Sequence, residues 1–346
     1  MTLKIGMVGG GYFGRFHINA WRRMEHATLF GLADLSDSCR ADLAAIYPGL
    51  ALHRDVESLL ADGYPDVIDV AVGLAHQADL IRPLLGRIPV IICQKPFCRS
   101  MEEAEALAKE AEQAGTLLIV HENFRFMPWY RAISKAIREG MIGPVRQACF
   151  RLRPGDGAGA DAYLSRQPYF RDMERFLVHE TGIHWIDVFR YLFGEPDAVY
   201  ADLWQANPVI RGEDAGLLTL TWENGLRATL DANRTLDHVA KNPRLTMGEF
   251  IVEGDKATLL LDGDGHLLHR MRGAAEAKEI PYQFEDRDFG GDCVLHFQKH
   301  VISHLREGTP LETQASDYLH NIRIEAAAYR SAAESRKINL RQPHSE

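Results

Sequence analysis

Two short stretches of the sequence carry the side chains best suited to chemistry. The first is Cys93-Gln94-Lys95-Pro96, whose lysine brings an ammonium group that can hydrogen-bond a substrate oxygen and stabilise negative charge developing there. The second covers residues 178–187 and contains His184. Histidine suits general base catalysis because its unperturbed pKa lies near neutrality. Together the two side chains predict a reaction in which a hydroxyl group loses its proton while its oxygen is polarised.

The histidine stretch also predicts how its polar groups are arranged. A helix over 180–193 carries one polar stripe along an otherwise apolar surface, made of Glu180, His184, Asp187 and Tyr191. Such groups must pair with one another or line a cavity. Glu180 is then a third catalytic candidate that binds substrate or base, and Asp187 fixes the tautomer of the imidazole. The alternative is a core histidine satisfied by a carboxylate. Metal binding is disfavoured because no third ligand stands in register.

The position of Lys95 supports its place in a site. A short buried strand is expected over 90–93, so Lys95 follows the carboxyl end of that strand, where parallel sheets bind their ligands. A residue before proline is kept out of helical geometry, and the Lys95–Pro96 bond can be cis. The alternative is a solvated surface lysine, which is the usual environment of this residue type.

A dinucleotide-binding signature opens the chain. An apolar strand over 3–8 runs into Gly9-x-Gly11-x-x-Gly14 and then into a helix. In such turns the glycines allow a sharp bend, a close approach of backbone to a pyrophosphate, and tight packing of helix on strand. A second strand over 28–33 ends at Asp34, where a carboxylate binds ribose hydroxyls. The combination predicts NAD as cofactor. Asp34 would repel the 2′-phosphate of NADP, although Arg40 leaves NADP open.

Further side chains are expected near cofactor or substrate, without a ranking among them. The predicted cofactor contacts are Gly9, Gly11, Tyr12, Phe13, Gly14, Asp34, Arg40, His76, Gln94, Lys95 and Asn123. The predicted substrate contacts are Lys95, Asn123, Arg125, Tyr163, Arg171, Glu180 and His184, and further polar candidates are Tyr169 and His296. For Asn123 and Arg125, hydrogen bonds that link two domains are an equal alternative.

The order of expected strands and helices predicts two domains. In residues 1–121, strands alternate with helices, which is typical of a parallel sheet covered on both faces, a Rossmann domain. Residues 122–346 form a substrate-binding and oligomerisation domain. There, strands follow one another with short turns over 198–205, 216–222, 227–232, 244–253, 257–261 and 266–270. The predicted fold class is therefore α/β, with an α+β second domain built on a large, open, mostly antiparallel sheet.

Composition excludes several classes of protein. The chain has 346 residues, of which 46% are hydrophobic and 25% charged, and no stretch is apolar enough to cross a bilayer. Because the first strand begins at once, no signal peptide is expected, and we predict a cytoplasmic location. A formal net charge of −9 disfavours nucleic acid as a partner. The five cysteines lack metal or disulfide spacing and are expected to be reduced packing residues.

Taken in order, these motifs resemble one known family. The set Gly9-x-Gly11-x-x-Gly14, Asp34, Gln94-Lys95-Pro96, Asn123-x-Arg125-Phe126 and Glu180-x-x-x-His184-x-x-Asp187 is similar to that of the glucose-fructose oxidoreductase, inositol dehydrogenase and rhizopine catabolism (Gfo/Idh/MocA) family. The resemblance implies an open sheet used for dimer or tetramer contacts, and oxidation of a sugar or polyol hydroxyl by NAD or NADP. Lys95 matches the lysine of the family's Glu-Lys-Pro motif, and His184 matches its general base.

The sequence departs from the family pattern at three places. Gln94 replaces the usual glutamate before the lysine, which removes a carboxylate and changes how Lys95 is held. Glu180 stands where the family usually has aspartate, which suggests a smaller or shifted substrate. Gly73-Leu74-Ala75 replaces the usual Thr-Pro-Asn, which puts the cofactor contacts of that loop in doubt.

The resemblance implies a specific reaction and leaves alternatives open. Residues 121–130 and 178–195 are most similar to branched-pentose dehydrogenases of this family, so the expected substrate is an aldopentose such as D-apiose, oxidised to a lactone. His184 is then the base and Lys95 the polarising group in hydride transfer to nicotinamide. An inositol-type polyol dehydrogenase is the first alternative. Two other classes are a non-catalytic NAD-binding regulator and an enzyme that retains NAD and recycles it within each turnover.

Overall fold

The computed structural model describes residues 2–341, and the chain divides into two compact units. Within this range, residues 2–123 and 293–322 form the first unit, and residues 124–292 and 323–341 form the second. The chain therefore returns to the first unit after the residues of the second sheet. A single boundary at residue 121 does not include this return. The division into domains 1–121 and 122–346 stays a prediction.

The first unit is built on a parallel sheet. In the described residues its strand order is β3-β2-β1-β4-β5-β6. The strands are β1 (Leu3–Val8), β2 (Ala27–Ala33), β3 (Leu52–His53), β4 (Val67–Val70), β5 (Val90–Gln94) and β6 (Leu117–His121). The helices are α1 (Gly14–Trp21), α2 (Asp37–Ile46), α3 (Val56–Ala61), α4 (Leu74–Ile81), α5 (Met101–Gln113) and α8 (Cys293–Glu307). The order reverses between β1 and β4, and ligands of such sheets bind beyond the carboxyl ends at this point.

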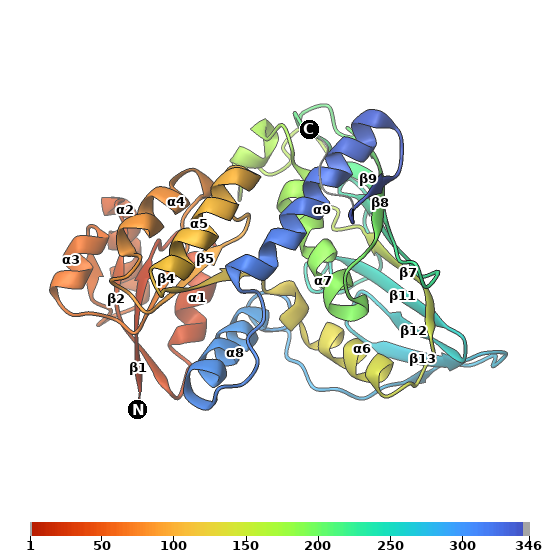
Figure 1. Ribbon diagram of the computed structural model, residues 1–346, viewed down its shortest axis with the longest axis horizontal. Helices are drawn as coiled ribbons and strands as arrows, with labels where there is room; N and C mark the ends of the chain where they lie inside the picture. Colours follow the sequence, from red (N-terminus) through yellow and green to blue (C-terminus); the bar gives the residue numbers. More distant parts are fainter. Residues whose placement is uncertain (1, 342–346) are drawn as a thin grey trace. The chain divides into compact units, whose positions relative to one another are not determined.

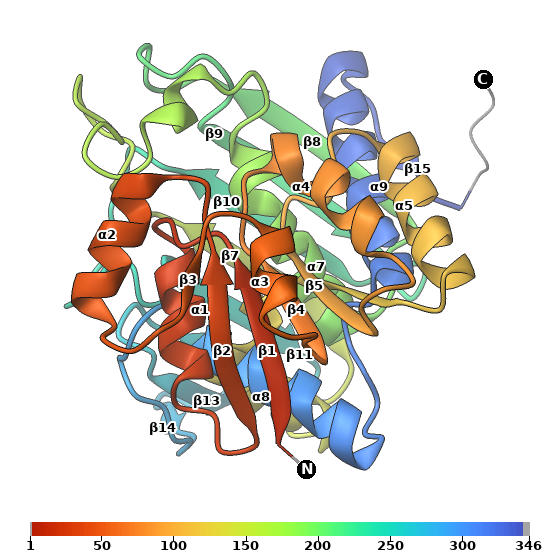
Figure 2. The same ribbon diagram turned by 90° about the vertical axis from the view of Figure 1, so that its left-hand side faces the viewer.

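Helices cover both faces of this sheet. A Cβ on Gly6 would lie 3.3 Å from Leu59 of α3, whereas Met7, the next residue of β1, contacts the start of α1 near Gly14. Because neighbouring residues of a strand point to opposite faces, α1 and α3 lie on opposite sides. Helix α8 packs beside α1, where Gln298 donates a hydrogen bond to the carbonyl oxygen of His17 at 3.4 Å. Figure 2 looks onto this sheet, with α3 in front of the strands and α8 behind them.

The second unit is built on a mixed sheet. In the described residues its strand order is β14-β13-β12-β11-β7-β10-β9-β8-β15. The strands are β7 (Val145–Leu152), β8 (Ala198–Trp204), β9 (Ala215–Thr221), β10 (Arg227–Asn233), β11 (Gly248–Gly254), β12 (Ala257–Leu261), β13 (Leu267–Met271), β14 (Lys278–Glu279) and β15 (Ile338–Asn339). The pairs are antiparallel except for β7 and β10, which are parallel. The helices are α6 (Pro128–Arg138), α7 (Ile183–Phe193) and the later part of α9 (Ala315–Glu334).

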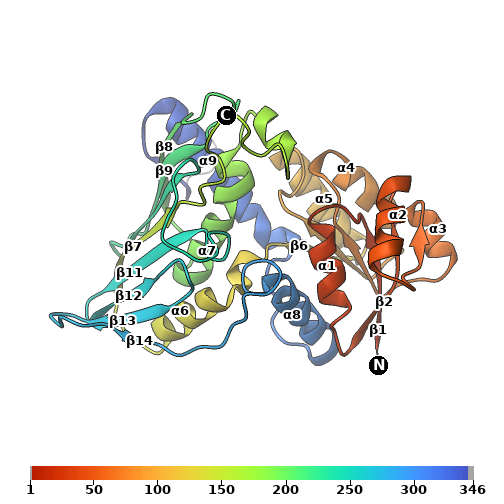
Figure 3. The ribbon, with the colours of Figure 1, turned by 180° about the vertical axis from the view of Figure 1, so that it is seen from behind.

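The two faces of this sheet differ. On one face, Tyr130 of α6 packs on Phe250, and Trp185 of α7 packs on Phe150 with ring centroids 4.5 Å apart. Figures 1 and 3 show α6 and α7 along this side of the sheet. The opposite face leaves large apolar side chains exposed by 36 to 41%: Tyr200, Trp204, Leu217 and Ile251. The fold class is as predicted: a Rossmann-type sheet followed by an open, mostly antiparallel sheet.

One expected strand begins later than its sequence pattern indicated. Of the range 244–253, only the part from Gly248 onward is strand β11. The hydroxyl of Thr246 donates to the carbonyl oxygen of Gly248 at 2.7 Å, and Met247 has φ +62°. A local side-chain hydrogen bond of this kind offers the backbone an alternative to the sheet. The residues just before β11 therefore form a turn.

Candidate active site

The glycine turn after β1 uses its three motif glycines differently. Gly9 has φ +96°, and a Cβ there would lie 2.4 Å from the carbonyl oxygen of Ala71. A Cβ on Gly14 would lie 2.5 Å from the carbonyl oxygen of Gly9, so α1 could not pack as closely on the turn. A Cβ on Gly11 would meet no described atom within 4 Å. Packing within the chain explains the first and third glycines, whereas the second leaves its backbone open to a ligand.

Asp34 is fixed at the carboxyl end of β2, beside the glycine turn. One carboxylate oxygen accepts a hydrogen bond from the N–H of Gly10 at 2.8 Å, and the other accepts from the N–H of Ser36 at 2.9 Å. Arg40 donates to the carbonyl oxygen of Asp34, and its guanidinium pairs with Asp37. The carboxylate is therefore held in place, while Arg40 is bound to an acidic group on its own helix.

Lys95 lies on a turn whose backbone is hydrogen-bonded on both sides by one buried side chain, that of Gln77. The lysine is half-buried after β5, and its bond to Pro96 is cis. The amide nitrogen of Gln77, on α4, donates to the carbonyl oxygen of Gln94 at 2.6 Å, and its amide oxygen accepts from the N–H of Cys98 at 3.4 Å. Gln77 has no exposed surface. A single side chain thus satisfies the backbone on both sides of Lys95.

The side chain of Gln94 joins a second buried set of hydrogen bonds. Its amide nitrogen lies 2.7 Å from Nε2 of His17, and Nδ1 of His17 lies 2.7 Å from a carboxylate oxygen of Asp69. The indole N–H of Trp21 donates to that same oxygen at 2.7 Å. When Gln94 donates to Nε2, the imidazole carries its proton at Nδ1 and donates it to Asp69. A glutamate at position 94 would meet this nitrogen favourably only if the imidazole were protonated.

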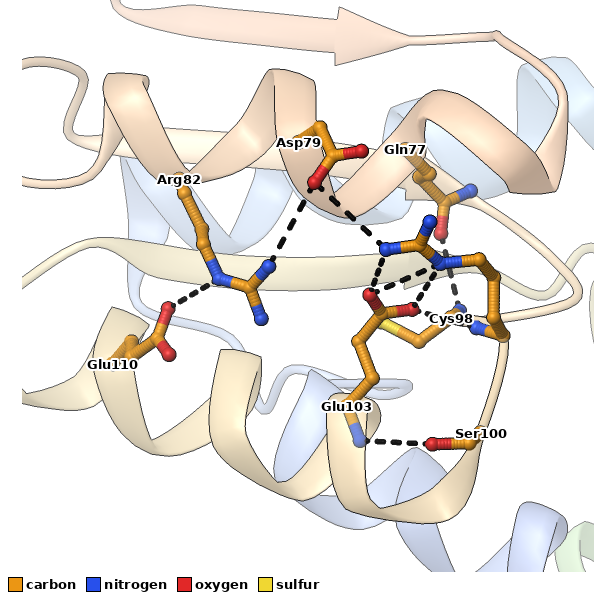
Figure 4. A network of polar contacts seen from close by, with 8 residues as sticks. Gln77, Asp79, Arg82, Cys98, Ser100, Glu103 and Glu110 are labelled. Carbon is orange, nitrogen blue, oxygen red and sulfur yellow. Dashed lines mark hydrogen bonds and ion pairs between the residues drawn. The ribbon is translucent and has the colours of Figure 1, made fainter.

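Beyond the lysine turn, ion pairs connect α4 and Arg82, which follows it, with α5 and Arg99, which precedes it. Arg99 pairs with Asp79 at 3.8 Å and with Glu103 at 2.5 Å. Arg82 pairs with Glu110 at 2.9 Å. Figure 4 shows these pairs together with Gln77 and its bond to the backbone after the lysine turn. Exposed pairs of this kind add little stability each, but together they tie both helices to the segment that follows Lys95.

The other candidate site residues of the first unit lie at its surface or within its core. Tyr12 is exposed on the glycine turn, and Phe13 packs edge-on against His17 with centroids 5.6 Å apart. His76 is exposed on α4, and His296 is exposed on α8. Asn123 is buried, with its amide nitrogen 3.0 Å from the sulfur of Cys293. Roles for these side chains in binding stay predictions.

The histidine stretch forms two kinds of helix. Residues Leu177–Gly182 form a π-helical turn, and α7 begins at Ile183. A π-helical turn is wider than an α-helical one and occurs frequently at functional sites. The prediction of one α-helix over 180–193 is therefore wrong at its start. Glu180 lies on the π-helical turn and His184 on α7, so the i, i+4 spacing of one α-helix does not describe the pair, and a shared polar stripe stays a prediction.

His184 is buried against an aromatic ring. It is 5% exposed, and its imidazole stacks on Phe124 with centroids 3.7 Å apart and planes 3° apart. Next to that ring, Arg125 donates to both carboxylate oxygens of Asp187, at 2.7 and 2.5 Å. This buried ion pair ties the segment 124–126 to α7. The carboxylate expected to orient His184 thus binds Arg125, and the roles of Asp187 in orienting the base and of Arg125 in binding substrate stay predictions.

The π-helical turn is anchored by groups that the sequence analysis did not assign to the site. The carboxylate of Glu213 accepts hydrogen bonds from the N–H groups of Phe176 and Val178 at 3.2 and 3.1 Å. The hydroxyl of Tyr329 donates to Glu213 at 2.6 Å and accepts from the N–H of His179 at 3.1 Å. Burial and the charge of Glu213 raise the pKa of Tyr329, which stays protonated. No local pattern reveals anchors so distant in the sequence.

Arg234 joins the loop that carries Tyr163 to the π-helical turn. Its guanidinium donates to both carboxylate oxygens of Asp156, at 3.2 and 2.8 Å, and to the hydroxyl of Tyr163 at 2.7 Å. It also donates to the hydroxyl of Thr181, the residue after Glu180. Tyr163 is 5% exposed, and burial raises its pKa. Its hydroxyl serves an internal network, and its role as a substrate contact stays a prediction.

Tyr169 and Arg171 lie together on a short 3-10 helix, Pro168–Asp172. Tyr169 is 55% exposed, and desolvation together with the negative charge of Glu180 raises the pKa of Tyr169 to about 12. The backbone carbonyl of Arg171 accepts a hydrogen bond from the N–H of Arg211 at 2.9 Å. This part of the second unit therefore presents a phenol and a carboxylate near one another. Contact of Arg171 with substrate stays a prediction.

Within residues 2–341 there is no group of three or more histidine, cysteine, aspartate and glutamate side chains that could hold a metal ion. In the same range, every helix is too short or too polar to cross a membrane.

Comparison with known proteins places both parts of the chain in one family. Residues 3–122 match the model described as an oxidoreductase family with an NAD-binding Rossmann fold. Residues 130–260 match the GFO/IDH/MocA C-terminal domain. The two matches fall on the parallel sheet and on the mixed sheet respectively.

Curated proteins and a solved structure align over nearly the whole chain. The D-apiose dehydrogenase of Paraburkholderia graminis is 32% identical over 99% of this chain and 91% of its own. The inositol 2-dehydrogenase of Rhizobium meliloti is 26% identical over 98% of this chain and 100% of its own. A crystal structure of an oxidoreductase from Agrobacterium radiobacter in complex with NAD+, L-tartaric acid and magnesium has a TM-score of 0.87 and 26% identity, covering 98% of this chain and 99% of that one.

These matches define the class of protein. The chain is an oxidoreductase with an NAD-binding Rossmann fold. It belongs to the Gfo/Idh/MocA family, as its motifs indicated. The prediction of an enzyme, an NAD(P)-dependent oxidoreductase acting on CH–OH groups, is confirmed by relatives that are named dehydrogenases.

Proposed function

We propose that this chain is an NAD-dependent dehydrogenase that oxidises a hydroxyl group of a small sugar or polyol. An aldopentose such as D-apiose is the first candidate substrate, and a lactone is its product. Two relatives named D-apiose dehydrogenase, at 32 and 28% identity, support this choice. The observation that carries the proposal is that Lys95 and His184 are both present, each held by surrounding contacts within its unit, in a chain with an NAD-binding fold.

NAD fits the first unit better than NADP. The open backbone at Gly11 suits a pyrophosphate, and the N-terminus of α1 favours its negative charge. Asp34 would accept hydrogen bonds from the ribose hydroxyls and repel a 2′-phosphate. Arg40, the group that could favour NADP, is paired with Asp37. When bound, NAD supplies a hydride acceptor at C4 of its nicotinamide.

The chain's own groups supply proton transfer and charge stabilisation. We assign to His184 the uptake of the hydroxyl proton by its imidazole while the C–H bond of the same carbon breaks. We assign to Lys95 a hydrogen bond to the hydroxyl oxygen, on which negative charge develops. Glu180 then binds a neighbouring hydroxyl of the sugar. With an anomeric carbon, loss of the hydride and the proton turns the cyclic hemiacetal into a lactone.

The exposed face of the second sheet supports a homo-oligomer. Tyr200, Trp204 and Leu217 lie on the neighbouring strands β8 and β9, and Ile251 lies on β11, beyond β10 and β7 in the same sheet. All four side chains point to the same side of the sheet. Apolar side chains gathered in this way are typical of a surface that a second copy covers. A dimer or tetramer in the cytoplasm, with a small molecule as substrate and neither nucleic acid nor membrane as partner, is the form that we propose.

An NAD reduction screen tests the proposed activity. The purified protein is assayed by NADH absorbance with D-apiose, other pentoses, hexoses and inositols, each with NAD and with NADP. We expect the highest kcat/KM with D-apiose or a related aldopentose and NAD. A higher value with an inositol would assign the chain to polyol oxidation. No absorbance change with any substrate would favour an NAD-binding regulator, and copurifying NAD that resists dialysis would favour an enzyme that recycles its cofactor.

A further inference from the structure

The turn that carries Lys95 has an unusual support. Its flanking polar backbone groups, the carbonyl of Gln94 and the N–H of Cys98, do not bond to each other but to the two ends of the Gln77 amide, at 2.6 and 3.4 Å. Cys98 has φ +67°, so its N–H is turned out of an extended path. The side-chain amide of Gln77 therefore supplies the hydrogen bonds that these two backbone groups would otherwise make to another part of the backbone.

Burial makes this support specific. Gln77 and Cys98 are 0 and 4% exposed, and Gln94 is 9% exposed. A buried carbonyl or N–H that loses its partner cannot turn to water, so the backbone must move when the amide is removed. Only a side chain with both a donor and an acceptor at its end can satisfy a carbonyl and an N–H together. Replacement of Gln77 is therefore expected to shift the turn.

We propose that Gln77 is a positioning residue for Lys95. It fixes the backbone on both sides of the lysine, and thereby the place from which the ammonium reaches the substrate oxygen. The inference rests on the catalytic role given to Lys95 in the proposed function. Gln77 itself is buried beneath the turn and acts through it.

The matched control is a second buried side chain that bridges two backbone groups of the same unit. The hydroxyl of Thr116 accepts from the N–H of Gly86 at 2.9 Å and donates to the carbonyl of Ile88 at 3.0 Å. It lies at the start of the segment leading into β6, away from the lysine turn. Thr116→Val removes both bonds at nearly constant volume, as Gln77→Met does. A difference in turnover between Gln77→Met and Thr116→Val then reflects the position of the lost hydrogen bonds in the fold rather than a general loss of stability.

The first measurement uses the protein without added cofactor. Amide hydrogen exchange is followed in the wild type, Gln77→Met and Thr116→Val. We expect faster exchange at Cys98 only in Gln77→Met, and at Gly86 only in Thr116→Val. Wild-type exchange at Cys98 in folded Gln77→Met would overturn the inference, because the turn would then hold without the amide.

The second measurement is steady-state turnover with the best substrate of the screen. In Gln77→Met we expect kcat to fall on the order of 10-fold or more, since small misplacements of a catalytic group have effects of this size. The KM for NAD should change by less than about twofold, as should both constants in Thr116→Val. Because Gln77 acts through Lys95, the double variant Gln77→Met/Lys95→Met should turn over no more slowly than Lys95→Met.

Gln77→Glu provides a conservative variant if the methionine variant does not fold. The charged groups around this position are Asp79 and Arg82 on its own helix and Arg99 and Glu103 beyond the turn (Figure 4), with the Cys98 thiol, whose pKa burial raises to about 12, and His17 across Gln94. A protonated carboxyl can donate to the Gln94 carbonyl and accept from Cys98, whereas a carboxylate can only accept.

The ratio of kcat in Gln77→Glu to kcat in the wild type should therefore rise as the pH falls. Two results would overturn the inference about Gln77 while leaving the proposed function intact. One is a kcat ratio of Gln77→Glu to wild type that stays near one at every pH. The other is a Gln77→Met variant as active as the wild type when Lys95→Met is impaired. A Lys95→Met variant with normal turnover would instead remove Lys95 from the reaction and overturn both the proposed function of that residue and the inference built on it.

Discussion

At the scale of single residues, the hydrogen bonds and ion pairs of Asp34 and Arg40 bear on the proposed cofactor preference. Asp34 accepts bonds from Gly10 and Ser36, which hold its carboxylate at the end of β2. Arg40 is engaged with Asp37. The carboxylate of Asp34 is thus held at the end of β2, whereas the guanidinium of Arg40 is paired with Asp37. We therefore expect Asp34 to decide the preference for NAD over NADP.

Asp34→Ala should raise the KM for NAD roughly 10-fold or more, because it removes a charged hydrogen-bond acceptor for the ribose. It should also raise the use of NADP relative to NAD, since the repulsion of the 2′-phosphate is lost. Steady-state kinetics with both cofactors measure the effect. Asp42→Ala is the control, because Asp42 is an exposed acid on the same segment that pairs with Arg15 at 3.4 Å. Unchanged preference in Asp34→Ala would contradict this assignment.

Residue types at motif positions were predictable, and their partners were not. Lys95 after a strand and Asp34 at a strand end follow from local patterns in the sequence. The bonds that hold the lysine turn join Gln94 to His17 and to Gln77, which are far from it along the chain. Such contacts depend on which helices the sheet brings together. The sequence therefore indicated that Gln94 changes the support of Lys95, but not what the support is.

At the scale of elements, the π-helical turn Leu177–Gly182 is the feature of the second unit on which the proposed site residues there depend. It carries Glu180 and leads directly into α7 with His184. Three elements hold it: the segment with Glu213, α9 with Tyr329, and the loop after β10 with Arg234. The first N–H groups of a helix are not bonded within that helix. Glu213 and Tyr329 accept hydrogen bonds from those of Val178 and His179, and Arg234 donates to the hydroxyl of Thr181.

Tyr329→Phe should loosen this turn. The substitution leaves the N–H of His179 and the carboxylate of Glu213 without the hydroxyl, and should lower the free energy of unfolding by roughly 1–3 kcal/mol. Turnover should fall as well, because Glu180 is carried on the same turn. Urea denaturation and kcat measure the two effects. Tyr64→Phe, at a position 61% exposed in the first unit, should change neither, and equal effects of both variants would contradict the role of the anchor.

The loop that carries Tyr163 should depend on pH through Asp156. Burial tends to raise the pKa of Asp156, but Arg234 and Arg166 outweigh it and lower this pKa. A carboxyl whose pKa is lower in the folded state stabilises the fold above its unfolded pKa, and this stability is lost as the pH falls through the folded value.

Asp156→Asn should therefore lower Tm most near neutral pH, and the difference from the wild type should shrink below about pH 4. Thermal unfolding across pH measures this difference. The control is Asp255→Asn, which removes an exposed pair with Arg146 and should have little effect at any pH. A constant difference for Asp156→Asn down to strongly acidic pH would contradict the ion-pair account.

Most elements could be predicted because their hydrophobic periodicity is clear. The strand Ala257–Leu261 has the limits expected from its pattern. The strands Leu52–His53 and Ile338–Asn339 are too short to show a period and are stabilised by neighbouring strands. The π-helical turn was read as α-helix because apolar spacing in a stretch of six residues does not separate the two. Tertiary hydrogen bonds decide between them.

At the scale of the whole molecule, the chain order and the two units do not coincide. Residues 293–322 follow the second sheet in the sequence but belong to the first unit. Helix α8 is amphipathic, and nothing in its own pattern says which unit its apolar face will cover. The sequence predicted both sheets and their order. It could not predict this return, which depends on packing between distant segments.

The exposed sheet face should hold copies of the chain together. Leu217→Arg places a charge among the apolar side chains of this face, and burial of an unpaired charge is strongly unfavourable. We expect a smaller assembly than the wild type in sedimentation velocity, with an unchanged circular dichroism spectrum. Val239→Arg, at a position 89% exposed and outside the strands, is the control. An unchanged assembly in Leu217→Arg would contradict an interface on this face.

The central claim is that Lys95 and His184 act on the same hydroxyl group while NAD accepts the hydride. Single-turnover formation of NADH at saturating NAD tests it most directly, with the wild type, His184→Ala and Lys95→Met compared in parallel with NAD binding. Both variants should bind NAD as the wild type does and form NADH roughly 10²- to 10⁴-fold more slowly, as expected for loss of a proton-transfer or charge-stabilising group. Near-normal NADH formation by either variant would contradict the account.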